Sequence, residues 1–196
     1  MRPEEITGVV LCGGSGARLG DADKPMTRFK GRRLVEYVIA ALTPQVDRFV
    51  ISCGRDRASY ETLGYPAVSD LRPGDGPLGG IVSALPYIET DWILTHPGDA
   101  PFADASLVAR LAPAAETSGV AVPRAGDYRQ NLVLLISHSK AESLARFYRD
   151  GGRAVRHWLD DHGVESVDMT DVADSFFNVN TAADLAACER RLSGPR

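Results

Sequence analysis

ITGVVLCGGSGARLGDADK, residues Ile6–Lys24, is the stretch from which the architecture of this chain can be worked out. Its first part, Ile6–Cys12, is a nearly continuous apolar run rich in β-branched residues, which predicts a strand buried on both faces. Four residues rich in glycine, Gly13–Gly16, end the run, and the cations Arg18 and Lys24 follow. A glycine loop after a strand exposes backbone N–H groups, so this stretch can wrap a polyphosphate whose charge the two cations neutralise.

Similar apolar runs recur along the chain and alternate with segments of helical periodicity. Strands are expected at residues 48–53, 66–69, 91–95, 119–123, 131–137, 165–169 and 176–179, and helices at residues 34–42, 55–63, 78–88, 104–111, 139–149, 153–161 and 181–192. Asp104 is the expected N-cap of its helix, and Thr181 and Asp184 resemble a capping box. This alternation predicts an α/β fold with a mostly parallel central sheet and helices on both faces.

Composition narrows the class of protein. With 196 residues, the chain is expected to form a single domain over residues 1–196, with a frayed tail at 193–196. Its net charge of −4 argues against a nucleic acid partner. Its three cysteines are widely spaced, the N-terminus does not resemble a signal peptide, and no apolar run is long enough to span a bilayer. We therefore expect a cytoplasmic protein that binds neither nucleic acid nor membrane.

The glycine loop fits neither common nucleotide-binding fingerprint. A GxGxxG motif from Gly14 would need glycine where the chain has Leu19, and the Gly-Lys pair of a P-loop does not occur. An ordinary strand-to-helix turn is the alternative, but four glycines in eight residues favour a phosphate loop. Two further loops that follow strands, residues 70–80 and 96–102, carry polar residues. Ligands of parallel sheets bind where such loops converge, so we expect one site there.

Asp99 is the candidate metal ligand. It follows a strand, in a turn bounded by Pro97 and Pro101. Mg²⁺ is commonly held by one or two carboxylates together with substrate phosphates. An isolated Asp in this setting would more simply form an Asx turn, but the phosphate loop on the same sheet edge favours the metal.

Three further features are open to two interpretations each. Asp70 can accept hydrogen bonds from a guanine edge or a ribose, or can merely initiate a turn. The pair Gly79–Gly80 lets a flat base approach the backbone, or meets a packing need at a helix start. Asn178 and Asn180, two residues apart, can contact a polar ligand group, or can cap the last helix and bridge loops.

We predict no catalytic or metal-binding role for the histidine and cysteine residues. The four histidines (His96, His138, His157 and His162) form no metal-binding or triad pattern, and the cysteines are expected to be small core residues.

These residues together resemble molybdenum cofactor guanylyltransferases, the MobA family. The segments that carry the resemblance are ITGVVLCGGSGARLGDADK, GPLGGIVSAL, PGDAPF, GGRAVRHWL and FNVNTAADL, at residues 6–24, 76–85, 97–102, 151–159 and 177–185. They span nearly the whole chain in the expected order. The resemblance implies a Rossmann-like nucleotidyltransferase fold and transfer of GMP from GTP to Mo-molybdopterin with release of pyrophosphate. It also implies molybdoenzymes or their chaperones as partners.

The resemblance also implies roles for individual residues. The catalytic set is Arg18, Lys24 and Asp99, with Asp99 as the Mg²⁺ ligand. The GTP-binding set is Leu11, Cys12, Gly13, Gly14, Lys24, Ser52, Asp70, Gly80 and Asp99. Asn178 and Asn180 match the family's NxN motif on the molybdopterin side.

Two other functions remain as alternatives. A related enzyme would use CTP or another phosphorylated acceptor, although the cytidylyl relatives tend to have Ala-Ala-Gly where this chain has Cys12-Gly13-Gly14. A nucleotide-binding adaptor without catalysis would not need Arg18, Lys24 and Asp99 together.

Overall fold

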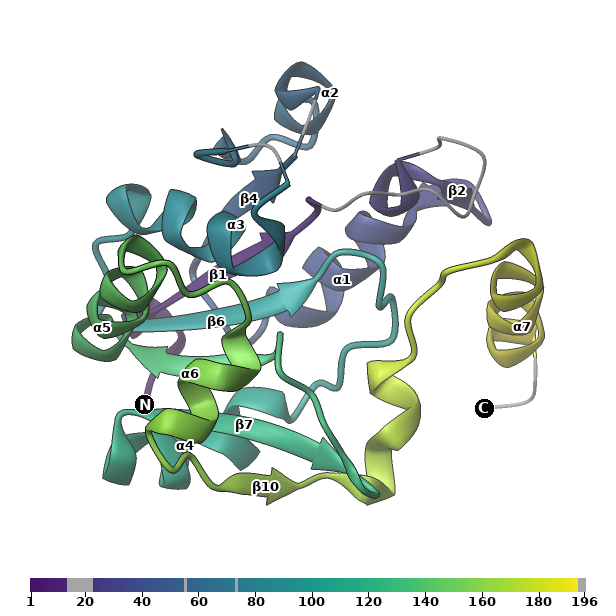
Figure 1. The fold of residues 1–196 in the computed structure, drawn as a ribbon. Helices are drawn as coiled ribbons and strands as arrows, with labels where there is room; N and C mark the ends of the chain where they lie inside the picture. The colour runs from purple at the N-terminus through teal and green to yellow at the C-terminus, as the bar shows by residue number, and fades with distance from the viewer. Residues whose placement is uncertain (14–22, 55, 73, 194–196) are drawn as a thin grey trace.

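One twisted sheet runs through the computed structural model, which describes residues 1–13, 23–54, 56–72 and 74–193 (Figure 1). The strand order is β10-β7-β9-β6-β1-β4-β5, with β8 paired to β7. These strands are β1 (Ile6–Leu11), β4 (Arg48–Cys53), β5 (Ala67–Ser69), β6 (Trp92–Pro97), β7 (Val120–Ala125), β8 (Tyr128–Arg129), β9 (Leu134–Ser137) and β10 (Ser166–Asp168). A separate hairpin joins β2 (Arg28–Phe29) to β3 (Arg32–Arg33).

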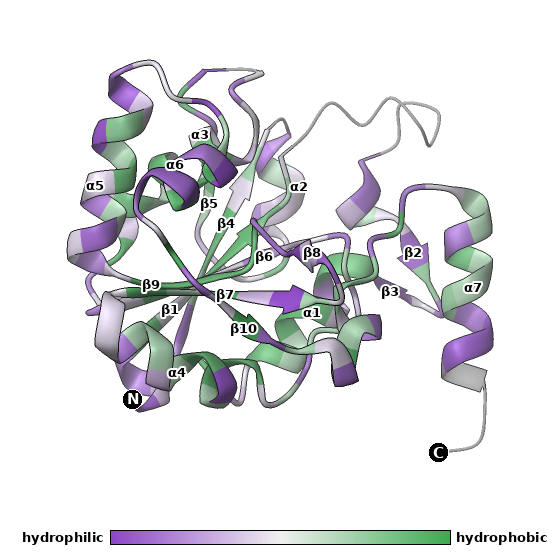
Figure 2. Ribbon diagram, turned by 60° about the horizontal axis from the view of Figure 1, so that its bottom comes forward, coloured by the Kyte–Doolittle hydropathy of each residue, from purple (hydrophilic) through white to green (hydrophobic). Residues whose placement is uncertain are grey.

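β1 lies inside the sheet, as its apolar run predicts. All six of its residues are buried, and it pairs in parallel with β4 on one side and β6 on the other. Figure 2 shows apolar colouring along these strands. The register sets Leu11 opposite both Ser52 and Pro97. The carboxyl ends of three parallel strands therefore meet at one edge of the sheet.

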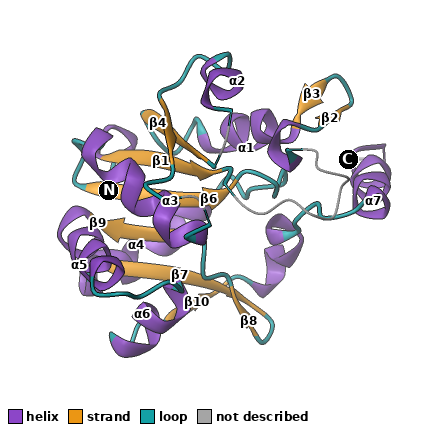
Figure 3. Cartoon of the chain, turned by 45° about the horizontal axis from the view of Figure 1, so that its top comes forward, coloured by secondary structure: helices purple, strands orange, loops and turns teal. Residues whose placement is uncertain are grey.

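Helices cover both faces of the sheet (Figures 1 and 3). One face carries α3 (Gly76–Ala84), α5 (His138–Arg149) and α6 (Val155–Asp161), which share a buried cluster that includes Leu78, Leu144 and Trp158. The other carries α1 (Leu34–Leu42), α2 (Arg57–Glu61) and α4 (Leu107–Ser118), whose cluster includes Val38, Tyr60 and Leu111. The predicted α/β class, with helices on both faces of a mostly parallel sheet, is confirmed.

β9 breaks the parallel pattern. It is antiparallel to both β6 and β7, with Thr95 opposite Leu134 and Ala121 opposite Leu135. Its amino end therefore lies at the same edge as the carboxyl end of β6. This reversal brings the segment that precedes β9 to the loops that follow β1 and β6.

Two local predictions are wrong. Residues 176–179 form no strand: a 3₁₀ helix, Thr170–Phe176, leads into irregular chain. The helix expected from Asp104 begins at Leu107 and continues to Ser118, with Pro113 inside it. Asp104 instead accepts a hydrogen bond from the backbone N–H of Ser106, at 2.8 Å, so it organises the turn before the helix.

The last helix, α7 (Ala182–Ser193), stands apart from the sheet, beside the β2–β3 hairpin (Figure 1). Buried Phe29, Leu34, Val179 and Cys188 form a small third cluster that holds it there. The helix extends to Ser193, one residue into the expected frayed tail, and residues 194–196 lie outside the described part. No helix in the described ranges combines the length and apolarity needed to cross a membrane.

Candidate functional site

The loops that follow β1, β4 and β6 are joined by backbone hydrogen bonds at the carboxyl edge of the sheet. The N–H of Cys12 donates to the carbonyl of Ser52 at 2.7 Å, and the N–H of Gly98 donates to the carbonyl of Leu11 at 2.9 Å. The start of the glycine loop thus lies between the other two loops. The convergence that the sequence predicts for the loops at residues 13–24, 70–80 and 96–102 is seen where Gly98 bonds to Leu11 and where Asp70 lies against Gly13.

Ser52, Asp70, Gly13 and Gly80 form one compact group. Ser52 Oγ donates to Asp70 Oδ1 at 3.3 Å. A Cβ added to Gly13 would lie 3.0 Å from Asp70 Oδ2, and one added to Gly80 would collide with Ser52 Oγ and lie 3.3 Å from Asp70 Oδ1. A side chain at position 80 would therefore collide with Ser52, and one at position 13 would make a tight contact with Asp70, so both glycines let the backbone lie close to this pair.

Packing contacts support one interpretation of the Gly79–Gly80 pair, and the approach of a base to this backbone stays a prediction. A Cβ on Gly79 would approach Asp75 Cβ to 2.8 Å, so packing at the start of α3 already requires a small residue there. Gly80, in contrast, faces the polar Ser52–Asp70 pair. Burial raises the pKa of Asp70, while the hydrogen bond from Ser52 opposes that shift and the charge of Asp75 adds to it. A partly buried acceptor of this kind is suited to the N–H or O–H groups of a ligand.

Lys24 and Asn180 meet although they are distant in the sequence. Lys24 Nζ donates to Asn180 Oδ1 at 3.0 Å. The N–H of Val179 donates to the carbonyl of Asp99 at 2.9 Å. The end of the glycine loop, the Asp99 turn and the NxN segment therefore form one continuous surface.

Asp99 is partly buried beside this cation. Burial raises the pKa of its carboxyl, and the positive charge of Lys24 partly offsets that shift. A further charged group beside Asp99 would shift the pKa of its carboxyl again, because charges interact more strongly where water is excluded. The Asp99 carboxyl is thus a partly buried acid with one cation beside it.

Asn180 is held in place by the start of α7. Asp184 Oδ2 accepts hydrogen bonds from the N–H groups of Asn180 and Thr181, at 2.9 and 2.8 Å, and Thr181 Oγ1 accepts from the N–H of Asp184 at 3.1 Å. This is the predicted capping box, with Asp in the usual place of Glu. Asn180 thus bridges loops, and its amide points to Lys24 rather than capping the helix.

Cys12 turns its thiol away from the loop surface. The side chain is buried, which raises the pKa of the thiol, and a Cβ on Gly98 would lie 2.5 Å from its Sγ. Nearby, Tyr60 donates to Asp23 Oδ1 at 2.6 Å, and burial raises the pKa of that carboxyl. Tyr60 thereby anchors the residue that precedes Lys24, a contact that the sequence pattern did not indicate.

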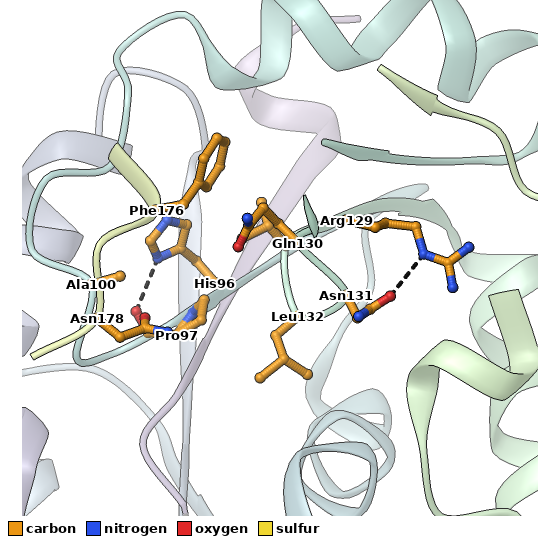
Figure 4. A pocket seen from close by; sticks show the side chains of 10 residues that line it. His96, Pro97, Ala100, Arg129, Gln130, Asn131, Leu132, Phe176 and Asn178 are labelled. Carbon is orange, nitrogen blue, oxygen red and sulfur yellow. Dashed lines mark hydrogen bonds between the residues drawn. The ribbon is translucent and has the colours of Figure 1, made fainter. Parts of the chain in front are cut away.

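A cavity of about 220 Å³ adjoins the Asp99 turn (Figure 4). Its walls come from the end of β6, the segment 129–133 before β9, and the chain at Phe176 and Asn178. Asn178 is therefore at this cavity, whereas Asn180 is at Lys24. His96, to which no role was assigned from the sequence, also lines it, and burial lowers the pKa of its imidazole to about 4. His96 belongs to no motif in the sequence, so the sequence did not predict that it lines this cavity.

The described residues could hold a Mg²⁺ ion only together with ligands from water and the substrate. Within the described ranges, no group of three or more His, Cys, Asp or Glu side chains is arranged to hold a metal. Asp99 is a single hard oxygen donor, and Mg²⁺ typically combines such a carboxylate with water and substrate phosphates. Two predicted residues, Gly14 and Arg18, lie outside the described part.

Comparisons with known proteins show the family to which the chain belongs. Residues 8–167 match the family model for the MobA-like NTP transferase domain. Molybdenum cofactor guanylyltransferases from Cupriavidus taiwanensis and Methylibium petroleiphilum are 36% and 38% identical, covering 96% and 95% of this chain and 98% and 96% of their own. The crystal structure of molybdopterin-guanine dinucleotide biosynthesis protein A from Archaeoglobus fulgidus is 27% identical with a TM-score of 0.74, covering 95% of this chain and 98% of its own. The chain belongs to the MobA-like NTP transferase family.

Proposed function

We propose that the protein transfers GMP from GTP to Mo-molybdopterin and releases pyrophosphate. The observation that carries this proposal is the contact between Lys24 and Asn180, with the Asp99 turn bonded to the same segment. It sets a cation and a carboxylate beside the NxN segment, where phosphates of two substrates would meet. The names of the relatives, molybdenum cofactor guanylyltransferases, support the choice of substrates.

The nucleotide would lie along the edge formed by the loops after β1, β4 and β5. The guanine would lie beside the Ser52–Asp70 pair and exchange hydrogen bonds with it, and Gly13 and Gly80 let the backbone pack closely against that pair. The phosphates would run toward Lys24. The full proposed GTP-binding set is Leu11, Cys12, Gly13, Gly14, Lys24, Ser52, Asp70, Gly80 and Asp99.

Catalysis would rest on position and charge rather than on a protein nucleophile. The acceptor phosphate already carries a nucleophilic oxygen, so no serine–histidine pair is needed. Lys24 and Arg18 would stabilise the negative charge that develops at the α-phosphate and the leaving pyrophosphate. Asp99 would hold Mg²⁺, which when bound supplies further positive charge at the phosphates. Asn180 keeps Lys24 in position for this role.

Pyrophosphate release with GTP, Mg²⁺ and Mo-molybdopterin tests the proposal. We expect release with GTP and little with CTP. Equal or greater release with CTP would show a cytidylyltransferase, and nucleotide binding without release would show an adaptor. The cytoplasm, where such cofactors would be passed to molybdoenzymes or their chaperones, is the proposed location.

A further inference from the structure

Tyr60 places a hydroxyl group in an apolar setting. The side chain lies on α2, is buried, and packs in the cluster on that face of the sheet, which also includes Val38 and Leu111. A buried tyrosine hydroxyl needs a hydrogen-bond partner, whereas phenylalanine would fill the same space without that requirement. Burial raises the pKa of Tyr60 well above its ordinary value, so the hydroxyl keeps its proton and donates it. The partner of this hydroxyl therefore indicates its role.

The partner belongs to the stretch that carries Lys24. Tyr60 Oη donates to Asp23 Oδ1 at 2.6 Å. The buried thiol of Cys12 interacts with the same hydroxyl. Cys12 directly follows β1, and Asp23 directly precedes Lys24. One hydroxyl on α2 thus links the end of β1 to the residue before the Lys24 cation.

Asp23 does not use its carboxylate as an aspartate before a helix usually does. It is the N-cap of the 3₁₀ turn Lys24–Met26, but its side chain makes no capping hydrogen bond. Its backbone carbonyl accepts from the N–H of Met26 at 3.0 Å, and the carbonyl of Lys24 accepts from the N–H of Thr27 at 2.9 Å. These two bonds make residues 23–27 one compact turn. Holding the Asp23 side chain therefore fixes the turn from which Lys24 extends.

Lys24 is thus held from two sides. Its ammonium group donates to Asn180 Oδ1 at 3.0 Å, and its backbone follows directly on the anchored Asp23. Asn180 fixes only the end of this long and flexible side chain. Fixing its backbone as well removes conformations that would otherwise be lost when a phosphate binds, so the cation is preorganised for an anion.

We propose that Tyr60 is a positioning residue, which holds Lys24 in place for a substrate phosphate by bonding to Asp23. Tyr60 is buried, so it does not contact the substrate itself. The inference rests on the proposed function, in which Lys24 binds the phosphates of GTP and of the leaving pyrophosphate. Binding of inorganic pyrophosphate is therefore the suitable measurement, because it needs neither the acceptor nor turnover.

Two Asp23 variants test the contact from its exposed side. Asp23→Asn and Asp23→Ala both remove the negative charge, but only the asparagine keeps an oxygen that can accept from Tyr60. Calorimetry with Mg²⁺ and inorganic pyrophosphate should show binding about 3- to 10-fold weaker in Asp23→Ala than in Asp23→Asn. Asp23 is an exposed residue, so both variants should fold. In a Tyr60→Phe background, the difference between the two variants should disappear, which a merely structural role of Tyr60 would not cause.

Tyr60→Phe tests the contact from the other side. It removes the hydroxyl and keeps the ring in the cluster, and it should weaken pyrophosphate binding by a similar factor of about 3 to 10. Tyr65→Phe is the matched control, because the Tyr65 ring packs against Phe49 on the same face of the sheet. Unmodified pyrophosphate affinity is expected in this control.

Three results would overturn the inference. They are equal pyrophosphate affinity in Asp23→Asn and Asp23→Ala, a difference between them that persists in the Tyr60→Phe background, and a weakening in Tyr60→Phe no greater than in Tyr65→Phe. Failure of the proposed function would look different. An unmodified protein that releases no pyrophosphate from GTP and Mo-molybdopterin, with the expected differences in binding intact, would overturn the proposed function and leave the role of Tyr60 standing.

Discussion

Lys24 is the residue on which the proposed phosphate chemistry most depends. Its ammonium group lies at the junction of the glycine loop, the Asp99 turn and Asn180. Lys24→Ala should lower kcat by about 100- to 1,000-fold, since loss of one preorganised donor to a transition state costs about 2.7–4 kcal/mol. Lys140→Ala, on α5, is the control. Unchanged GTP-dependent turnover in Lys24→Ala would remove the catalytic assignment.

Asp99 links activity to stability. Burial raises its pKa in the folded protein. The folded state therefore binds the proton more tightly than the unfolded state, so this group stabilises most at low pH, and its contribution is lost as the pH rises through the folded pKa. The Asp99→Asn side chain is neutral at every pH, so this variant should have a higher Tm at pH 7. Each kcal/mol gained in the free energy of unfolding should raise Tm by about 2–4 °C. The same variant should lose turnover.

The pH series supplies the check on Asp99. Below about pH 4, the ordinary value for an aspartate, the two proteins should have nearly equal Tm. Thermal unfolding of both at several pH values measures this. A Tm gain that persists undiminished at low pH would assign the effect to packing rather than to charge.

Gly80 gives a stability test that is independent of any substrate. An added methyl group would collide with Ser52 Oγ, so Gly80→Ala should destabilise the fold by about 1–3 kcal/mol. In a Ser52→Ala background, the clash is relieved and the same substitution should cost much less. A double-mutant cycle in urea measures the coupling. Additive effects of the two substitutions would show that the side chains do not meet.

At the level of single elements, the start of α7 determines where Asn180 lies. Asp184 accepts from two backbone N–H groups, and these bonds lower the pKa of its carboxyl. Asp184→Ala should cost about 1 kcal/mol, as loss of a helix cap usually does, and should loosen Asn180. Asp184→Asn, which can still cap, is the control.

Two measurements follow the Asp184 variants. Hydrogen exchange in α7 should rise in Asp184→Ala more than in Asp184→Asn, because the first turn loses its acceptor. The KM for Mo-molybdopterin should rise as well. Protection of α7 equal to that of the unmodified protein would show that the small Phe29–Cys188 cluster alone holds the helix.

At the scale of the whole molecule, polar contacts link α5 and the segment before α6 to the start of α3. Tyr148 on α5 donates to Asp75, which precedes α3, and Arg153 Nε lies 3.4 Å from Asp75 Oδ1. The Arg153 guanidinium also lies 4.8 Å from the centre of the Tyr148 ring. Asp75 is next to the segment that carries Gly79 and Gly80. The packing of α5 and α6 therefore controls the loop proposed to hold the guanine.

Arg153→Ala should raise the KM for GTP a few-fold and leave kcat unchanged, because Arg153 supports the loop without contacting the reacting groups. Steady-state kinetics with varied GTP measures the split. Arg156→Ala, on the exposed side of α6, is the matched control. A fall in kcat without a change in KM would contradict a positioning role.

The sequence by itself determined the features whose cause is local. The apolar run before Gly13, the helical spacing in residues 34–42 and the Thr181–Asp184 capping box lie within short stretches, and each formed as expected. The strand predicted at residues 176–179 does not form. Its alternation of apolar and polar residues is too short to outweigh the packing of Phe176 and Val179 into different clusters. The strand propensity of four residues has less effect on the fold than the burial of their side chains.

Only the tertiary structure decided the rest. Lys24 and Asn180 are 156 positions apart, and their contact depends on where α7 packs. The cavity at His96 exists because β9 runs antiparallel to β6, which brings residues 129–133 to the carboxyl edge. Strand direction, burial of an imidazole and the pairing of distant loops follow from the packing of the whole chain. No local pattern encodes them, since each depends on contacts between residues far apart in the sequence.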